Sequence, residues 1–465
     1  MPSHPILREY YAEPEVRRCL LEFMGGDHPD RVTCEYITGD GEEESLRQPR
    51  VPSELHDCLN EGLEIGRSLW DRESFLVHLD IEYVNFDFPA KVYLEPERCF
   101  ALQTPVERTV EKILANCGIA PLHILSGRGH HFVWRIRRDS AAFARLLVLG
   151  RSGASLKQLN ARPHPPTNRP ISPELGATFS GLGLVMEYLA GRIKELAAPQ
   201  CTVPVELTAV EVGPSVHGRE MISIDISEYG DPLHTRMTRV PFSVYLKPWQ
   251  QRVLSPEDLE KLPTMFFVPL HEMDVRHGLR AMRHAGTVID LAATVTMRIP
   301  DASDGMVNLI AEYEASPLAR FHESFYADQS QGEAPARDSA FLASLPACAR
   351  QILAEPNDLL LQPGRVRLLT RVLLALEWNP RQIARLICAK FEEEHAWGER
   401  WQEYDAAMRA DFYVRIFAGL FAVEIDDLVD FNCQSAREEK VCPVAECPWN
   451  LAEFRRSALN RRHHD

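Results

Sequence analysis

Residues 123–136 of the chain read HILSGRGHHFVWRI, a Gly-Arg-Gly turn between two apolar runs, with a pair of histidines after the turn. A tight turn uses glycine because glycine adopts backbone conformations that other residues avoid. It needs neither the arginine nor the histidines, so these side chains have another task. The alternation in HHFVWRI predicts a β-strand, in which successive side chains point to opposite faces. His130 then shares a face with Phe132 and Trp134, whereas His131 lies on the other face.

Three further segments show the same two-faced alternation: LVHLDIEY at 76–83, MISIDIS at 221–227 and RVPFSVYLK at 239–247. Each has one apolar face suited to a covering layer of helices and one face that carries polar groups. If the four strands share a sheet, the polar faces form a groove. Its charged side chains would include Asp80, Glu82, Asp225, His131, Arg239 and Lys247.

At 465 residues the chain is too long for one compact core, so two or three domains are expected. Its 45% hydrophobic and 25% charged residues are typical of a globular protein. No apolar run is long enough to span a membrane and the start does not resemble a signal peptide, so we expect a cytoplasmic protein with no membrane partner. The formal net charge of −16 argues against a general polyanion binder but leaves room for a local basic groove.

The rest of the chain divides by its sequence pattern. Apolar spacing predicts a helix within 105–118, closed by Gly118, and another near 183–197. The small polar residues before position 340 are typical of a linker. The fold class expected is α+β. Its units would be a strand-containing domain (1–267), a helical connector (268–325), a linker (326–339) and a mainly helical, cysteine-containing domain (340–465).

The carboxylates of Asp80 and Glu82 lie on one strand face, where their like charges repel. Taken alone, such a pair is as typical of a solvated strand face as of a site. A divalent cation would relieve the repulsion, and hard oxygen ligands suit Mg²⁺ or Mn²⁺. The turn offers backbone N–H groups and the Arg128 guanidinium to a phosphate. Metal ligands beside phosphate ligands are what phosphoryl transfer requires.

Three of the eleven cysteines gather near the end of the chain, in FNCQSAREEKVCPVAECPWN. Their spacing, Cys433-x8-Cys442-x4-Cys447, favours a metal site in a reducing compartment, with an exposed cysteine-rich turn as the alternative. A fourth ligand is needed, and Cys348 in LPACARQIL is the candidate. The cysteines expected in the core instead are Cys388, Cys19, Cys58 and Cys117.

In their order and spacing the strand motifs resemble those of the archaeo-eukaryotic primase superfamily, the primase–polymerases. In that family a hydrophobic strand carries Asp-x-Asp or Asp-x-Glu, matched here by Asp80 and Glu82. A second strand is entered through a Ser/Gly-rich turn and ends in a histidine, matched by His131 in SGRGHH. The third motif is a hydrophobic residue followed by Asp, matched by Asp225 in ISID, with Asp231 in EYGDP as the alternative.

Primase small subunits carry a further strand, Arg-x-Pro-x-Ser-x-His-x-Lys, which RVPFSVYLK matches with Tyr245 in place of the histidine. The resemblance implies an RRM-like antiparallel-sheet catalytic core with helical insertions, and two-metal nucleotidyl transfer. Asp80, Glu82 and Asp225 would hold Mg²⁺ or Mn²⁺. The residues that would bind the triphosphate are Ser126, Arg128, His131, Arg239, Ser243 and Lys247, with Gly127 and Gly129 giving access to the backbone.

The segment 340–465 resembles the iron–sulfur domain of the primase large subunit. The cofactor this implies is a [4Fe–4S] cluster, with Zn²⁺ as the alternative, on Cys348, Cys433, Cys442 and Cys447. The chain is then expected to be a DNA primase/polymerase that makes or extends primers on single-stranded DNA from NTPs or dNTPs, alongside other replication or repair proteins. One alternative is a catalytically inactive nucleic-acid-binding scaffold, which the three carboxylates disfavour. The other is a metal-dependent nuclease, which has no use for a triphosphate-binding strand.

Overall fold

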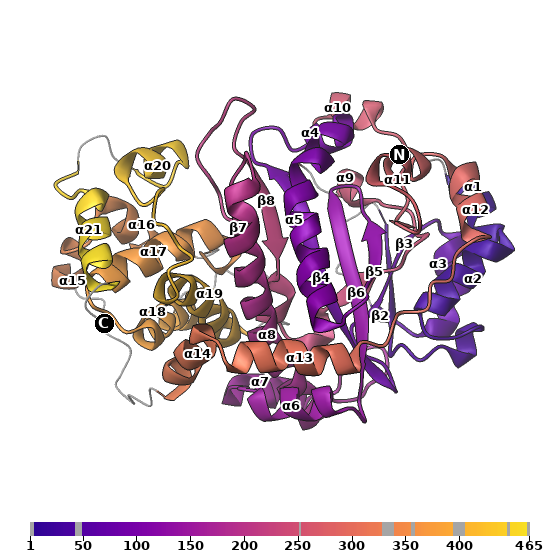
Figure 1. Cartoon of the computed structure of the whole chain (residues 1–465), viewed down its shortest axis with the longest axis horizontal. Coiled ribbons are helices and arrows are strands. Elements are labelled where there is room, and N and C mark those ends of the chain that lie inside the picture. Colours follow the sequence, from indigo (N-terminus) through magenta and orange to yellow (C-terminus); the bar gives the residue numbers. More distant parts are fainter. Residues whose placement is uncertain are drawn as a thin grey trace.

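The computed structural model describes residues 4–41, 49–250, 253–327, 339–354, 359–393, 405–443 and 447–462. Within them the chain is a mixed α/β protein whose sheets are mainly antiparallel (Figure 1). The strands are β1 (Ile37–Asp40), β2 (Pro49–Arg50), β3 (Glu64–Ser68), β4 (Ser74–Asn85), β5 (Leu122–Leu125), β6 (Gly129–Arg137), β7 (Val205–Leu207), β8 (Glu220–Asp225), β9 (Met237–Arg239) and β10 (Val268–Pro269).

The helices before residue 250 are α1 (His4–Ala12), α2 (Pro14–Phe23), α3 (Leu55–Asn60), α4 (Lys91–Leu94), α5 (Pro96–Cys117), α6 (Ala141–Leu149), α7 (Ala154–Asn160), α8 (Pro173–Ala197) and α9 (Lys247–Gln250). Those that follow are α10 (Pro256–Lys261), α11 (Val275–Ala281), α12 (Ala285–Ala292), α13 (Ser303–Glu314), α14 (Pro317–Ala327), α15 (Ser339–Ala343), α16 (Ala347–Ala354), α17 (Pro363–Ala375), α18 (Pro380–Glu393), α19 (Ala406–Ala422), α20 (Cys433–Glu438) and α21 (Leu451–Arg462). None of the described helices is long and apolar enough to cross a membrane.

The larger sheet has six strands in the order β10-β5-β6-β4-β8-β7, with the long strand β4 near its centre. All its pairs are antiparallel except β7 with β8. On β4, Asp80 lies opposite His131 of β6 on one side and opposite Asp225 of β8 on the other. Residues paired across neighbouring strands point their side chains to the same face of the sheet. The register therefore places Asp80, His131 and Asp225 side by side on one face.

The opposite face of this sheet is apolar and is covered by helices α5 and α8, as Figure 1 shows for α5. Phe132 and Trp134 of β6 are fully buried. Phe75 of β4 stacks on Phe179 of α8, with ring centroids 5.8 Å apart. Helix α5 ends at Gly118, where glycine adopts a φ of 78° without strain. The sequence predicts this end, although the helix begins well before the predicted start.

The smaller sheet has four strands in the order β2-β1-β3-β9. The prediction that 239–247 is one strand of the larger sheet is wrong. Strand β9 ends at Arg239, and an irregular stretch then leads into helix α9 at Lys247. Pro241 cannot donate a ladder hydrogen bond, and Phe242 has a positive φ of 65°, which a regular strand excludes. The polar side chains of this stretch therefore do not share one strand face.

The predicted helical connector contains the helices α11 to α14, preceded by the short strand β10. Most of the predicted linker, residues 328–338, lies outside the described residues, while its ends belong to α14 and α15. The described parts of the C-terminal segment are mainly helical, from α15 to α21. The predicted mixture of helices with antiparallel sheets is therefore confirmed, whereas the division of the chain into domains stays a prediction.

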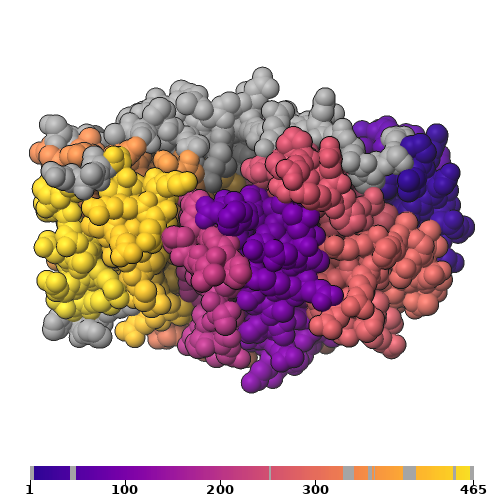
Figure 2. All heavy atoms as spheres, turned by 90° about the horizontal axis from the view of Figure 1, so that it is seen from above, coloured from indigo at the N-terminus to yellow at the C-terminus, as the bar shows by residue number. Residues whose placement is uncertain are grey.

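The C-terminal helices pack directly against the sheet-containing part. Figure 2 shows them (yellow) abutting the segment around residue 200 (magenta). Arg409 of α19 forms an ion pair with the fully buried Asp231, and Arg415 of the same helix pairs with the buried Glu187 of α8. Asp231 is thus a partner of α19 and does not join the carboxylates of β4 and β8.

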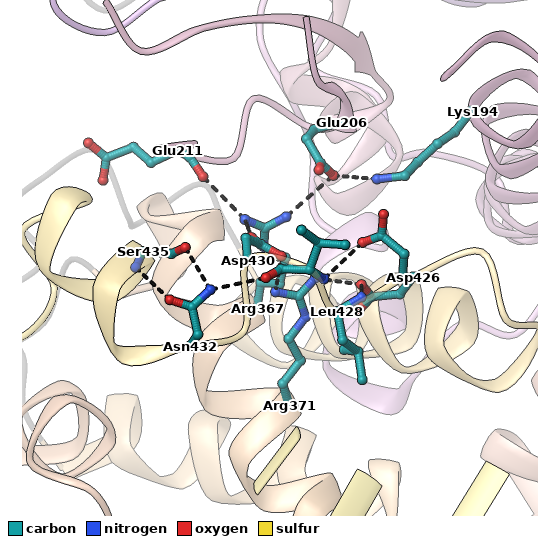
Figure 3. Close-up of polar contacts among 12 residues, drawn as sticks. Lys194, Glu206, Glu211, Arg367, Arg371, Asp426, Leu428, Asp430, Asn432 and Ser435 are labelled. Atoms are coloured by element: carbon teal, nitrogen blue, oxygen red, sulfur yellow. Dashed lines mark hydrogen bonds and ion pairs between the residues drawn. The ribbon is translucent and has the colours of Figure 1, made fainter. Parts of the chain in front are cut away.

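A set of ion pairs joins helix α17 to the edge strand β7 (Figure 3). Arg367 lies 3.3 Å from Glu206 of β7 and 2.7 Å from Asp430. Arg371 donates to Asp426 at 2.8 Å and to Asp430 at 2.9 Å. Burial raises the pKa of Asp426, but the Arg371 guanidinium outweighs it and holds that pKa below its ordinary value. We call this set the ion-pair network; it consists of Lys194, Glu206, Arg367, Arg371, Asp426 and Asp430.

Candidate active site

Three carboxylates meet on the polar face of the larger sheet: Asp80 and Glu82 of β4 and Asp225 at the end of β8. One oxygen from each lies within 4.8 Å of the others. Two-residue spacing puts Asp80 and Glu82 on one face, and strand pairing puts Asp225 directly opposite Asp80. The structure thus brings together the three acids that the sequence singles out, and we call them the carboxylate cluster.

Asp80 is the least compensated member of the carboxylate cluster. Its side chain is 13% exposed, and its Oδ1 is buried without a hydrogen-bond partner among the described residues. Burial and then the charge of Glu82 raise the pKa of Asp80 well above its ordinary value, and Asp225 adds to the rise. A divalent cation would stabilise such an unsatisfied oxygen beside two other carboxylates. The all-oxygen donor set therefore fits Mg²⁺ or Mn²⁺.

Glu82 has two cationic partners from segments distant in sequence. The Arg128 guanidinium forms an ion pair with Oε2, and the Lys247 ammonium lies 3.1 Å from Oε1. Burial raises the pKa of Glu82, but Arg128 and then Lys247 hold it well below its ordinary value. Burial and the Arg128 charge in turn lower the pKa of Lys247 to about 8. Both cations are of the kind that also binds a phosphate.

His131 faces the carboxylate cluster from β6, with its Nε2 3.4 Å from Asp80 Oδ1. Burial, then His78 and Arg239, lowers its pKa well below the ordinary value, so the imidazole is neutral at pH 7. His78 is a neighbour that the sequence motifs miss: its ring centroid lies 4.8 Å from that of His131, and its Nδ1 lies 3.2 Å from Glu228. Its place on the polar face of β4 was the available signal. Its pairing with Glu228 is a long-range contact that no local pattern announces.

The Ser-Gly-Arg-Gly turn is shaped by contacts within the protein. Ser126 Oγ accepts hydrogen bonds from the backbone N–H groups of Arg128 and Gly129, at 3.3 and 3.1 Å. A Cβ on Gly127 would lie 2.4 Å from the ring of Tyr245, and one on Gly129 would lie 1.8 Å from a carbonyl oxygen of β4. Packing therefore requires both glycines, and the expectation that they also open the backbone to a triphosphate stays a prediction.

Two residues predicted to bind triphosphate lie outside the carboxylate cluster. Arg239 forms an ion pair with the fully buried Glu64, although it is close enough to help lower the pKa of His131. Ser243 is fully buried, and its Oγ accepts a hydrogen bond from the backbone N–H of Ile65 at 2.6 Å. Because the strand ends at Arg239, Ser243 turns toward the smaller sheet, and the structure does not bring it to the cluster.

The four cysteines predicted to bind a metal are only partly gathered. Cys348 is buried in helix α16, and burial, together with the nearby Cys442 and Cys433, raises its pKa to about 12. Among the described residues no three of these cysteines, Cys447 included, have sulfur atoms within 4.8 Å of one another. Tetrahedral Zn–S bonds of about 2.3 Å would put the sulfur atoms about 3.8 Å apart. The thiols are therefore neighbours but do not form a closed zinc site.

Comparisons with known proteins were made at three levels. No protein-family model matches the chain, and no curated protein or solved structure gives a significant match.

Proposed function

We propose that the chain is a metal-dependent nucleotidyltransferase, a DNA primase/polymerase of the archaeo-eukaryotic primase superfamily. The observation that carries the proposal is the carboxylate cluster, with one oxygen of Asp80 unpartnered among the described residues and Arg128, Lys247 and His131 beside it. Oxygen donors next to cations suit a nucleoside triphosphate, which needs metal ions and positive side chains together. The order of the strand motifs along the sequence supports the same reaction class.

In the proposed reaction a 3′-hydroxyl oxygen bonds to the α-phosphorus of the nucleotide while the bond from that phosphorus to the pyrophosphate oxygen breaks. Divalent ions, when bound, would favour loss of the hydroxyl proton to water and would neutralise charge on the departing pyrophosphate. Asp80, Glu82 and Asp225 would hold those ions. Arg128 and Lys247 move from Glu82 to the β- and γ-phosphates, which offer them more negative charge than one carboxylate. His131 is neutral, so it donates a hydrogen bond to a phosphate oxygen without adding charge.

The proposed template is single-stranded DNA, and the proposed substrates are NTPs or dNTPs. In this proposal the larger sheet is the RRM-like core of the superfamily, and the helical C-terminal region holds the initiating nucleotide beside a [4Fe–4S] cluster or Zn²⁺. The proximity of Cys348 to Cys433 and Cys442 supports a resident metal there. We also propose a cytoplasmic location, whose reducing conditions suit cysteines that form no disulfide among the described residues.

The test uses the full chain with single-stranded DNA, Mg²⁺ or Mn²⁺ and labelled NTPs or dNTPs, first without and then with a primer. We expect labelled products from the wild type and from Asp57→Asn, a control at an exposed position of α3, and none from Asp80→Asn. Shortening of the DNA without incorporation would indicate a nuclease. DNA binding without either reaction would indicate an inactive scaffold, and either outcome would overturn the proposal.

A further inference from the structure

A second group of potential metal ligands lies on the other face of the same strands. Glu107 of α5, His123 of β5 and His130 of β6 each offer one atom within 4.8 Å of the others. His130 is adjacent to His131 in sequence, but strand alternation turns it toward α5, where its ring centroid lies 5.2 Å from that of Phe100. The sheet therefore separates this group from the carboxylate cluster.

The two imidazoles are in direct contact, with His123 Nε2 2.9 Å from His130 Nδ1. His130 is fully buried, and its other ring nitrogen, Nε2, has no hydrogen-bond partner among the described residues. Glu107 is 7% exposed, and among the described residues its carboxyl group has neither a hydrogen bond nor an ion pair. Buried polar atoms normally have partners, so a ligand that satisfies both groups at once would remove a cost to stability.

The surroundings resemble those of a metal-binding histidine. Glu111 lies one helical turn after Glu107, and its carboxylate lies 3.6 Å from His123 Nδ1. Histidine ligands commonly give their second ring nitrogen to a carboxylate in this way, which orients the ring for the metal. Burial and then the charge of His123 lower the pKa of His130 well below its ordinary value, so its ring is in the neutral form that a metal requires.

We propose that Glu107, His123 and His130 bind a Zn²⁺ ion. Zinc accepts two imidazole nitrogens and one carboxylate oxygen, whereas nitrogen donors disfavour Mg²⁺. Zinc bonds of about 2.0–2.2 Å put ligand atoms roughly 3.3 Å apart, so the ion would take the place of the His123–His130 hydrogen bond and draw together three ligand atoms that already lie within 4.8 Å of one another. The ion ties helix α5 to the strands on either side of the Ser-Gly-Arg-Gly turn. This structural role does not depend on the proposed function.

The test measures zinc content and unfolding temperature of the full chain after removal of metal and reloading with Zn²⁺. Glu107→Gln removes a ligand with little change of shape, His123→Asn removes another, and His56→Gln at an exposed position of α3 is the control. We expect the wild type and His56→Gln to bind one more zinc per chain than the two ligand variants. Their unfolding temperature should rise by several degrees with zinc, because a ligand of the folded state alone stabilises it.

The stability of the metal-free protein is the reference against which the effect of zinc is measured. Burial raises the pKa of Glu107 to about 7, above its ordinary value, so the ionised carboxylate opposes folding at pH 8. Metal-free Glu107→Gln should therefore be at least as stable as the wild type, and only its response to zinc should be lost. Equal zinc content and equal zinc-dependent shifts in Glu107→Gln and the wild type would overturn the proposal.

Loading with Co²⁺ distinguishes the proposed site of Glu107, His123 and His130 from the C-terminal cysteines. Co²⁺ on thiolates gives strong sulfur-to-metal charge-transfer absorption, which a site of nitrogen and oxygen ligands lacks. The wild type should show visible cobalt bands that Glu107→Gln loses while any thiolate absorption stays. If thiolate absorption is the only cobalt signal, His123 and His130 are a metal-free hydrogen-bonded pair and the proposal is wrong.

Discussion

The carboxylate cluster and the ion-pair network both bury several charges, yet they are built differently. In the network Arg371 bonds to Asp426 and Asp430, and Arg367 pairs with Asp430 as well (Figure 3). The pKa of Asp430 is held below its ordinary value because Arg367 and Arg371 outweigh the effect of burial. In the carboxylate cluster both cations lie against one acid, Glu82, and burial raises the pKa of the other acid on that strand.

This difference separates two uses of buried charge. A network in which every carboxylate meets a guanidinium holds elements together, and removal of one member leaves the others unpaired. A cluster with an unsatisfied carboxylate oxygen gains stability only when a ligand arrives, which is typical of functional sites. The network should therefore respond to mutation in stability, and the carboxylate cluster should respond in activity.

The largest expected effect is that of Asp80→Asn, which should lower nucleotide incorporation at least about a thousandfold because the bound ions lose a ligand. The pKa of Asp80 is raised in the folded protein, so its ionised form opposes folding above its ordinary pKa. Without divalent ions at pH 7 the variant should thus be as stable as the wild type or more so. Incorporation assays and denaturant unfolding measure the two effects, and retained activity would contradict the assignment.

Glu82→Gln distinguishes the role of Glu82 from that of Asp80. Activity should fall as far as in Asp80→Asn, but the free energy of unfolding should also fall, by about 1–3 kcal/mol, because Arg128 and Lys247 lose their partner. From the sequence alone, both substitutions would be expected to relieve repulsion between like charges. A Glu82→Gln protein more stable than the wild type would mean that this repulsion outweighs both cations.

In the network, Asp426→Asn should cost about 3 kcal/mol of unfolding free energy, because Arg371 loses a buried partner. The adjacent Asp427→Asn, at an exposed position, is the matched control. Since the pKa of Asp426 is lowered in the folded state, its contribution is full above the ordinary value of 3.8 and is lost as the pH falls below it. The wild type should therefore lose stability more steeply than Asp426→Asn below about pH 4. Equal stability of Asp426→Asn and Asp427→Asn at pH 7 would contradict the prediction.

The carboxylate cluster could be predicted from the sequence because strand alternation is a local property. Period-two patterns identify the polar faces of three strands, and antiparallel pairing then places Asp225 beside Asp80. The prediction of a fourth strand at 239–247 is wrong, because the segment alternates like a strand but the strand ends at Arg239. Its alternate residues Val240 and Phe242 are buried, but so is Tyr245. The backbone of this stretch bonds first to Ile65 and then to Phe267 and Met265, so it does not follow one neighbouring strand.

Other features were beyond local reasoning because they depend on residues far apart in the chain. Position 127 requires glycine because any larger side chain would collide with the ring of Tyr245, a residue more than a hundred positions later in the chain. The ion pair of Asp231 with Arg409 joins segments separated by 178 positions, so the sequence could not decide between Asp225 and Asp231. Alternation alone also cannot decide whether a buried histidine such as His130 only packs in the core or serves as a ligand.

Substitution of a C-terminal cysteine separates the two proposed activities, initiation without a primer and extension of a primer. Truncation before α15 would remove Arg409 and Arg415, which pair with the buried Asp231 and Glu187, so point substitutions are the cleaner test. Cys442→Ser should lower the bound iron or zinc and reduce primer-free initiation about tenfold or more while primer extension persists. Cys201→Ser, in the sheet-containing part, is the control. Unchanged metal content and initiation in Cys442→Ser would remove the cysteines from the proposal, and would leave the carboxylate cluster untouched.

The smallest expected effect is a pH dependence that comes from Lys247. Burial and the Arg128 charge lower its pKa to about 8, so the ammonium is present at pH 7 and largely lost at pH 9. If only the ammonium binds the triphosphate, the apparent KM for nucleotide should rise about tenfold per unit above pH 8. Lys247→Arg keeps its charge throughout this range, because a guanidinium titrates far higher, so its KM should stay flat even if its absolute value differs. Steady-state kinetics from pH 7 to about 9.5, at saturating DNA and metal, give both curves. A flat KM in the wild type, or a rise of equal steepness in Lys247→Arg, would mean that Lys247 remains with Glu82 and that the cluster binds its nucleotide without it.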